Sequence, residues 1–170
     1  MPPPLNAAAR LGVRYREASG DDLPFLAAVY ASTRMEELAP TGWPEEGKQR
    51  FLAQQFEAQH RHYRQHYLTA EWLVIERGGK PVGRLYIDEW PQEVRLIDIA
   101  LLPEARGEGV GGAVLADAME QAAAAGKPLT IHVERNNPAL RLYRRLGFDA
   151  IGEHGIYLLM EWRPETVSTA

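Results

Sequence analysis

The 170-residue chain contains no cysteine, which excludes disulfides, thiolate metal sites and a cysteine nucleophile. It has no apolar run of about 18 residues, so no membrane-spanning helix is expected. Its N-terminal stretch lacks the long apolar segment of a signal peptide. With a net charge of −4, it also lacks the basic excess typical of nucleic-acid-binding proteins. These absences predict a soluble, cytoplasmic protein with no nucleic-acid partner and no membrane partner.

What is present is the composition of one globular domain. Hydrophobic residues make up 45% of the chain and charged residues 25%, and the length suits a single core. We expect the domain to span residues 13–163. We expect residues 1–12 and 164–170 to be flexible termini, because three consecutive prolines near the start suit neither a helix interior nor a central strand.

The pattern of apolar and turn-forming residues predicts an α/β fold. Helices are expected over residues 21–38, 44–67 and 109–125, with a short one after Pro138; strands are expected over residues 13–17, 72–76, 82–87, 93–102, 128–133, 148–152 and 156–162. Short turns should join the second, third and fourth strands into an antiparallel meander. The fourth and fifth strands enclose a helix and should be parallel, with a right-handed crossover. The prediction is a mixed, mostly antiparallel sheet with helices on both faces.

The most informative stretch is Leu96–Gly112, which reads as a buried strand, a short turn and a glycine-rich helix start. Backbone amides at a helix N-terminus have no partner within the helix, and the helix dipole adds positive charge there. Both features favour a phosphate or pyrophosphate. Arg106 adds a permanent cation, and the glycines let the backbone approach a ligand closely.

Two fingerprints fit this loop. Gly107, Gly109 and Gly112 match G-x-G-x-x-G of dinucleotide-binding enzymes, and Glu134 lies near the end of the next strand, where a ribose-binding acid is expected. Residues 106–111 also match R-x-x-G-x-G. The dinucleotide fold requires further parallel strands, whereas an antiparallel meander precedes this loop and an antiparallel hairpin follows it. The strand order therefore favours the second fingerprint.

Two more motifs follow in order. Asn136 begins N-x-x-A, and residues 142–148 read L-Y-x-x-x-G-F. With the glycine loop, they make the chain similar to the GNAT (GCN5-related) N-acetyltransferase family over about residues 70–162. The resemblance implies the acyl-CoA N-acyltransferase fold. It also implies transfer of an acetyl group from acetyl-CoA to a primary amine of a small molecule, or to an amino terminus, by direct attack. A catalytically inactive CoA-binding sensor or interaction module is the alternative.

The resemblance implies a role for each motif residue. The backbone of the strand end would bind the pantetheine arm, through Ile99, Ala100 and Leu101. The loop would hold the pyrophosphate, through Arg106, Gly107, Glu108, Gly109, Val110, Gly111 and Gly112. Asn136 would hydrogen-bond the cofactor arm. Tyr143 would lie near the thioester sulfur and donate a proton to the leaving thiolate.

The reaction also requires a base, because a free alkyl amine has a pKa near 10 and is protonated at neutral pH. His132, with an ordinary pKa near 6.5, lies on the strand beside the expected cofactor site. Glu93 on the neighbouring strand is the second candidate. Asp98 on that strand is interpreted as a hydrogen-bond acceptor in the core.

The acceptor amine should bind between the first two helices and the closing hairpin. Carboxylates and aromatic rings suit a cationic amine, and this region offers Arg34, Glu36, Glu37, Trp43, Tyr86 and Asp88. No metal is expected, because His62 and His66 share a helix face without a third ligand at suitable spacing. The edge of the closing hairpin is consistent with a homodimer.

Overall fold

A computed structural model describes residues 2–165; the side chain of Glu36 and part of the expected flexible C-terminus, residues 166–170, lie outside the described residues. The strands are β1 (Val13–Glu17), β2 (Glu71–Arg77), β3 (Lys80–Glu89), β4 (Val94–Leu101), β5 (Leu129–Glu134), β6 (Asp149–His154) and β7 (Tyr157–Trp162). The helices are α1 (Leu23–Leu38), α2 (Glu45–His66), α3 (Val110–Ala125) and α4 (Leu140–Arg145).

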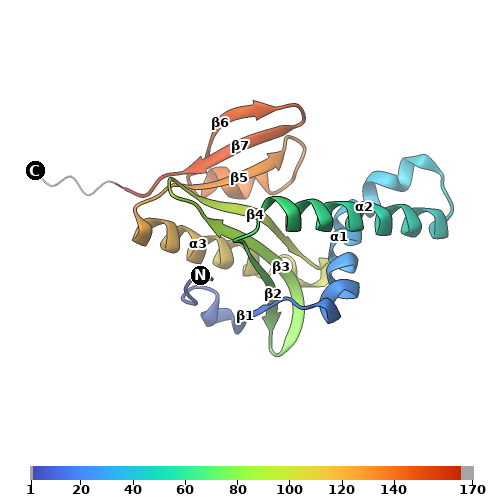
Figure 1. Ribbon diagram of the computed structural model, residues 1–170, viewed down its shortest axis with the longest axis horizontal. Coiled ribbons are helices and arrows are strands. Elements are labelled where there is room, and N and C mark those ends of the chain that lie inside the picture. Colours follow the sequence, from blue (N-terminus) through green and yellow to red (C-terminus); the bar gives the residue numbers. More distant parts are fainter. Residues whose placement is uncertain (1, 166–170) are drawn as a thin grey trace, which may run out of the picture.

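The strands form one sheet in the order β1-β2-β3-β4-β5-β7-β6 (Figure 1). Neighbouring strands are antiparallel except for β4 and β5, which are parallel and connected through α3. The predicted meander, crossover and closing hairpin are confirmed. A dinucleotide-binding fold is excluded, because it requires a series of parallel strands.

The parallel pair β4–β5 separates partway along its length. Its ladder covers Val94–Leu96 against Leu129–Ile131 and then stops, although β4 continues to Leu101. The register between β3 and β4 also shifts just after this point, where Ile87 lies opposite Leu96 and Tyr86 lies opposite Asp98. Beyond the shift, β4 remains paired with β3 only, so its edge toward β5 is open.

Helices cover both faces of the sheet, as predicted (Figure 1). One core joins α3 and α4 to apolar strand residues such as Leu85, Leu96 and Ile131. On the other face, α1 and α2 pack through Leu26, Tyr30, Leu52 and Phe56 against Val74. Because side chains alternate along a strand, the polar residues of β5 lie on this second face. Among the described residues, no helix is both long and apolar enough to cross a membrane.

Part of the N-terminal arm is held against the domain. The backbone N–H groups of Asn6, Ala7 and Ala8 donate to the carboxylate of Asp117 on α3, at 3.2, 2.8 and 2.9 Å. Ala8 and Asp117 are both fully buried. Residues 6–8 are therefore anchored to the middle of α3. The prediction of a flexible arm did not include this contact.

Candidate active site

The glycine loop leads directly into α3. Gly107 and Gly109 have φ values of 79° and 83°, in the left-handed region that glycine adopts without strain. The amide of Ala113 donates to the carbonyl of Gly109 at 3.0 Å, which begins the hydrogen bonding of the helix. The amides before Ala113 therefore lie outside the helix's own ladder, at the positive end of its dipole.

At two further positions of the loop, packing does not require glycine. A Cβ atom added to Gly112 would meet nothing within 4 Å, and one added to Gly111 would meet only the side chain of Leu101, at 3.7 Å. Neither residue has a positive φ. Open space in front of a helix N-terminus is what a closely bound phosphate requires. These residues therefore fit the pyrophosphate of coenzyme A.

The open edge of β4 lies next to this loop. Ile99, Ala100 and Leu101 pair with Leu85, Arg84 and Gly83 of β3 on one side only. Arg106 donates from Nε to the carbonyl of Leu101 at 3.1 Å. Its guanidinium is therefore held between the strand end and the glycine loop, as the sequence motif requires.

Tyr143 lies on α4 and is 4% exposed. Its ring packs edge-on against Phe148 at a centroid distance of 5.5 Å. Burial raises the pKa of the Tyr143 hydroxyl, and the negative charge of Asp98 raises this pKa further. The hydroxyl is therefore protonated at neutral pH and is able to donate a proton.

Asp98 is the carboxylate that sequence reasoning assigned to the core. It lies just beyond the point where β4 leaves β5 and forms an ion pair with Arg84 of β3. Arg84 is 2% exposed and also donates to Gln59 of α2 at 3.1 Å. The position of Asp98 within an apolar strand was the available signal, because a charge there requires a partner.

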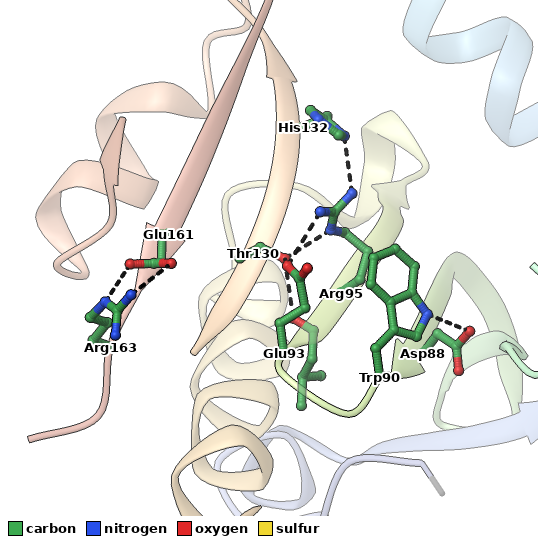
Figure 2. A network of polar contacts seen from close by, with 9 residues as sticks. Asp88, Trp90, Glu93, Arg95, Thr130, His132, Glu161 and Arg163 are labelled. Carbon is green, nitrogen blue, oxygen red and sulfur yellow. Dashed lines mark hydrogen bonds and ion pairs between the residues drawn. The ribbon is translucent and has the colours of Figure 1, made fainter. Parts of the chain in front are cut away.

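His132 and Glu93 belong to a network centred on Arg95 (Figure 2). Arg95 donates to Thr130 Oγ1 at 2.8 Å, contacts His132 Nδ1 at 3.2 Å and forms an ion pair with Glu93 at 3.3 Å. Its guanidinium also lies over the Trp90 ring, 4.7 Å from the centroid. The structure thus brings both predicted bases to one arginine.

This arrangement restricts His132 as a base. A guanidinium can only donate, so Nδ1 of His132 accepts from Arg95, and we infer that Nε2 carries the proton. Partial burial lowers the pKa of His132, and the charge of Arg95 lowers it further. The ring is therefore neutral at pH 7, but its basic nitrogen is occupied. Glu93 precedes β4 and lies about 16 Å from Asp98 along an extended strand.

A cavity of about 620 Å³ opens between α1, α2, the end of β5 and the β6–β7 turn. Its lining includes Tyr30, Arg34, Glu37, Phe51, Gln59, Glu134, Asn136 and Tyr157. Arg34 forms ion pairs with Glu134 at 2.7 Å and with Glu37 at 3.1 Å. Two of the expected acceptor residues and the predicted cofactor ligand Asn136 therefore border the same space.

Three other residues expected at the acceptor site have different roles. Trp43 packs edge-on against Phe51 at 5.4 Å. Tyr86 is buried against Trp72, and the buried carboxylate of Asp88 accepts hydrogen bonds from Thr69 and Trp90. Tyr86 and Asp88 are thus structural, because residues of α2, β2 and the adjoining turns enclose their side chains. In the described part of the chain, no three His, Asp or Glu side chains are grouped to hold a metal.

Comparison with known proteins agrees with this geometry. The profile of the acetyltransferase (GNAT) family matches residues 32–148. An uncharacterised N-acetyltransferase of Methanocaldococcus jannaschii is 34% identical over 88 residues, which are 46% of this chain and 38% of that protein. The chain therefore spans well under half the length of that relative.

Solved structures share the fold over most of the chain. PaiA N-acetyltransferase from Thermoplasma acidophilum, in complex with coenzyme A, superposes with a TM-score of 0.68 and is 19% identical. This match covers 89% of the present chain and 99% of the other. An acetyltransferase from Thermus thermophilus gives a TM-score of 0.61 at 20% identity, covering 89% and 96% of the two chains.

Proposed function

Because the chain belongs to the GNAT family of acetyltransferases, we propose that it transfers the acetyl group of acetyl-CoA to a primary amine by direct attack. The acceptor is a small molecule or an amino terminus. The observation that carries this proposal is the separation of β4 from β5 immediately before a glycine loop and a helix N-terminus. An open strand edge suits the pantetheine amides of coenzyme A, and the free amides at a helix N-terminus suit its pyrophosphate.

The cofactor would follow these two features. The backbone groups of residues 99–101 would pair with the pantetheine amides, as an added strand does. The amides of residues 107–112 and the guanidinium of Arg106 would hold the pyrophosphate. Asn136, on the cavity wall, would hydrogen-bond the arm near its reactive end.

The reaction then needs one group that removes a proton from the amine and another group that donates a proton to the thiolate. The amine must lose a proton before it attacks, and the departing thiolate must gain one. Tyr143 would supply the second proton, since its hydroxyl is protonated at neutral pH. For the first step, His132 and Glu93 stay candidates from the sequence. All three possible bases contact an arginine, so Asp98 is favoured instead by its place on the open part of β4 and by its charge, which acts on Tyr143.

Two isosteric variants separate these bases. We expect Asp98→Asn to lower kcat/KM about 100-fold, the lower range for loss of a general base, with unchanged affinity for CoA. His132→Gln should retain most of the activity, because it leaves Asp98 and Tyr143 intact. The opposite result would return the role of base to His132.

The cavity at the end of β5, which Asn136 borders, would receive the acceptor. Glu37, Glu134 and the aromatic rings of Tyr30, Phe51 and Tyr157 suit an amine that arrives as a cation.

A homodimer is also proposed; it is supported by the edge strand β6, where Ile151 is 53% exposed. Sedimentation equilibrium would test it.

Release of free thiol from acetyl-CoA across a panel of primary amines tests the activity. We expect thiol release that depends on both the amine and the enzyme, and mass spectrometry should find the acetylated amine. Binding of acetyl-CoA without turnover of any amine would instead support a CoA-binding sensor. Absence of CoA binding would contradict both functions.

A further inference from the structure

Arg77 links three segments that are distant in the sequence. It lies at the end of β2, and its Nε donates to the carbonyl of Leu11 in the N-terminal arm at 2.9 Å. Its Nη1 forms an ion pair with the carboxylate of Glu108, between the two positive-φ glycines of the loop. One side chain therefore fixes both the arm and the loop that precedes α3.

The arm that Arg77 contacts is itself anchored to α3. Residues 6–8 are bound by Asp117, about two turns into the helix, and Asn6 also donates to Glu120 at 2.7 Å. From there the arm returns toward the helix start, where a Cβ atom on Gly109 would lie 3.9 Å from Leu11 Cδ1. The arm lies beside α3 in Figure 1. The anchored arm thus fixes the position of the Leu11 carbonyl, which accepts a hydrogen bond from Arg77 and orients its side chain.

Glu108 is the one acidic residue within the glycine loop, residues 107–112. A carboxylate so close to a helix N-terminus is attracted by the same amides and dipole that favour a phosphate. It would also repel a bound diphosphate. The ion pair with Arg77 holds this carboxylate and offsets its charge. Both side chains are partly exposed, so the pair itself stabilises the fold little.

We propose that Arg77 is a positioning residue for acetyl-CoA, which keeps the Glu108 carboxylate from competing with the pyrophosphate for the start of α3. This inference rests on the proposed function. It assigns a role to a residue that lies outside every recognised motif. It also gives the anchored arm a purpose, because the arm holds Arg77 in the orientation that reaches Glu108.

A double-mutant cycle on CoA affinity tests this role. Isothermal titration calorimetry at low salt would compare the unsubstituted protein with Arg77→Met, Glu108→Gln and the double variant. We expect Arg77→Met to raise the Kd for CoA about 3- to 10-fold, within the range of coupled contacts. Glu108→Gln should bind CoA at least as tightly as the unsubstituted protein. In the Glu108→Gln background, removal of Arg77 should change Kd less than about 2-fold.

The cycle distinguishes this role from simpler ones. If Arg77 acted only as a nearby positive charge, its removal would weaken binding equally in both backgrounds, and the inference would be wrong. Equal Kd values for Arg77→Met and the unsubstituted protein would also overturn it, without affecting the proposed function. Arg163→Met is the matched control, since Arg163 pairs with Glu161 beside β7 and should not alter Kd. If the unsubstituted protein fails to bind CoA, the proposed function and this inference both fail.

Discussion

Tyr143 is the residue whose environment most clearly suits one chemical role. Its hydroxyl is buried and its pKa is raised, so at neutral pH the hydroxyl is protonated, as the proposed proton donor must be. We expect Tyr143→Phe to lower kcat about 100-fold, the lower range for loss of a positioned acid, while the Kd for CoA changes little. Steady-state kinetics and calorimetry would measure the two quantities.

Tyr15→Phe is the matched control for this prediction. Tyr15 also has a raised pKa because of burial, and its hydroxyl is buried without a hydrogen-bond partner. It lies on β1, far from β4 in strand order, so its loss should leave kcat unchanged. Unchanged turnover in Tyr143→Phe would remove Tyr143 from the mechanism.

Residue types and spacing were sufficient to predict the motif residues, but not their partners. Arg106, Gly107 and Tyr143 could be named as candidates because the motifs that contain them depend on local spacing alone. The Arg84–Asp98 pair and the contact of Arg95 with His132 depend on which strand positions lie opposite each other. A register shift between β3 and β4 sets the first of these, and nothing in the local sequence encodes that shift.

At the scale of elements, a capping box starts the short 3₁₀ turn Gly20–Asp22, which leads directly into α1. The backbone N–H of Ser19 donates to Asp22 at 2.7 Å, and Arg16 donates to the same carboxylate. The hydrogen bond from Arg16 holds the pKa of Asp22 well below its usual range. Because this pKa is lower in the folded state, the contribution of Asp22 to stability is present above pH 4 or so and is lost as pH falls further.

We therefore expect Asp22→Asn to lower the free energy of unfolding by about 1 kcal/mol at pH 7, as loss of a helix cap does. The difference from the unsubstituted protein should shrink as pH falls below about 4, because Asp22 is then protonated in the unfolded chain while it is still charged in the folded protein. Urea titrations at pH 7 and below pH 4 would measure the free energy of unfolding of both proteins. The exposed neighbour Asp21→Asn is the control. A difference that is the same at both pH values would contradict this account.

At the start of α3, an effect of a substitution on stability can be separated from its effect on CoA affinity. Gly112→Ala adds a methyl group to open space within a helix, so stability should stay the same or rise by up to about 1 kcal/mol. If the pyrophosphate approaches these amides, the same methyl group should raise the Kd for CoA at least 10-fold. Calorimetry and thermal unfolding would measure both effects, and unchanged affinity would move the pyrophosphate away from this helix.

Gly83 in β3 provides the contrast. A Cβ atom there would lie 2.4 Å from the carbonyl oxygen of Ala100 and 2.7 Å from a methyl group of Leu101. Gly83→Ala should therefore lower stability by about 1–3 kcal/mol, because β4 must move. Gly109 is a less useful test than Gly112, since its positive φ makes any substitution strained.

The boundaries of most elements could be predicted because apolar periodicity and turn residues are local signals. Two features of the elements have no local signal. The separation of β4 from β5 was indicated only by the family resemblance, which implied that residues 99–101 bind a cofactor through their backbone, and it coincides with the register shift between β3 and β4. The arm looked flexible because of its prolines, yet a carboxylate more than 100 residues away binds its amides.

At the scale of the whole molecule, the predicted cofactor-binding residues lie on both sides of the separation of β4 from β5. The open edge of β4 and the start of α3 lie on one side of the separation, and Asn136 follows β5 on the other. Arg34 of α1 reaches Glu134 at the end of β5. A cofactor along the open edge would therefore add contacts at the point where β4 and β5 are no longer paired with each other.

This arrangement predicts that acetyl-CoA stabilises the whole domain. At a concentration 100 times its Kd, a ligand that binds only the folded state adds about 2.7 kcal/mol. For a chain of this size, that gain corresponds to a rise in Tm of roughly 5–10 °C. NAD and NADP should give no such rise, because the sheet lacks the parallel strands on which a dinucleotide site is built. Differential scanning fluorimetry with all three ligands would measure it, and Gly112→Ala should reduce the shift with acetyl-CoA. A rise in Tm with NAD or NADP but not with acetyl-CoA would overturn the assignment of the glycine loop to coenzyme A, whatever the fold.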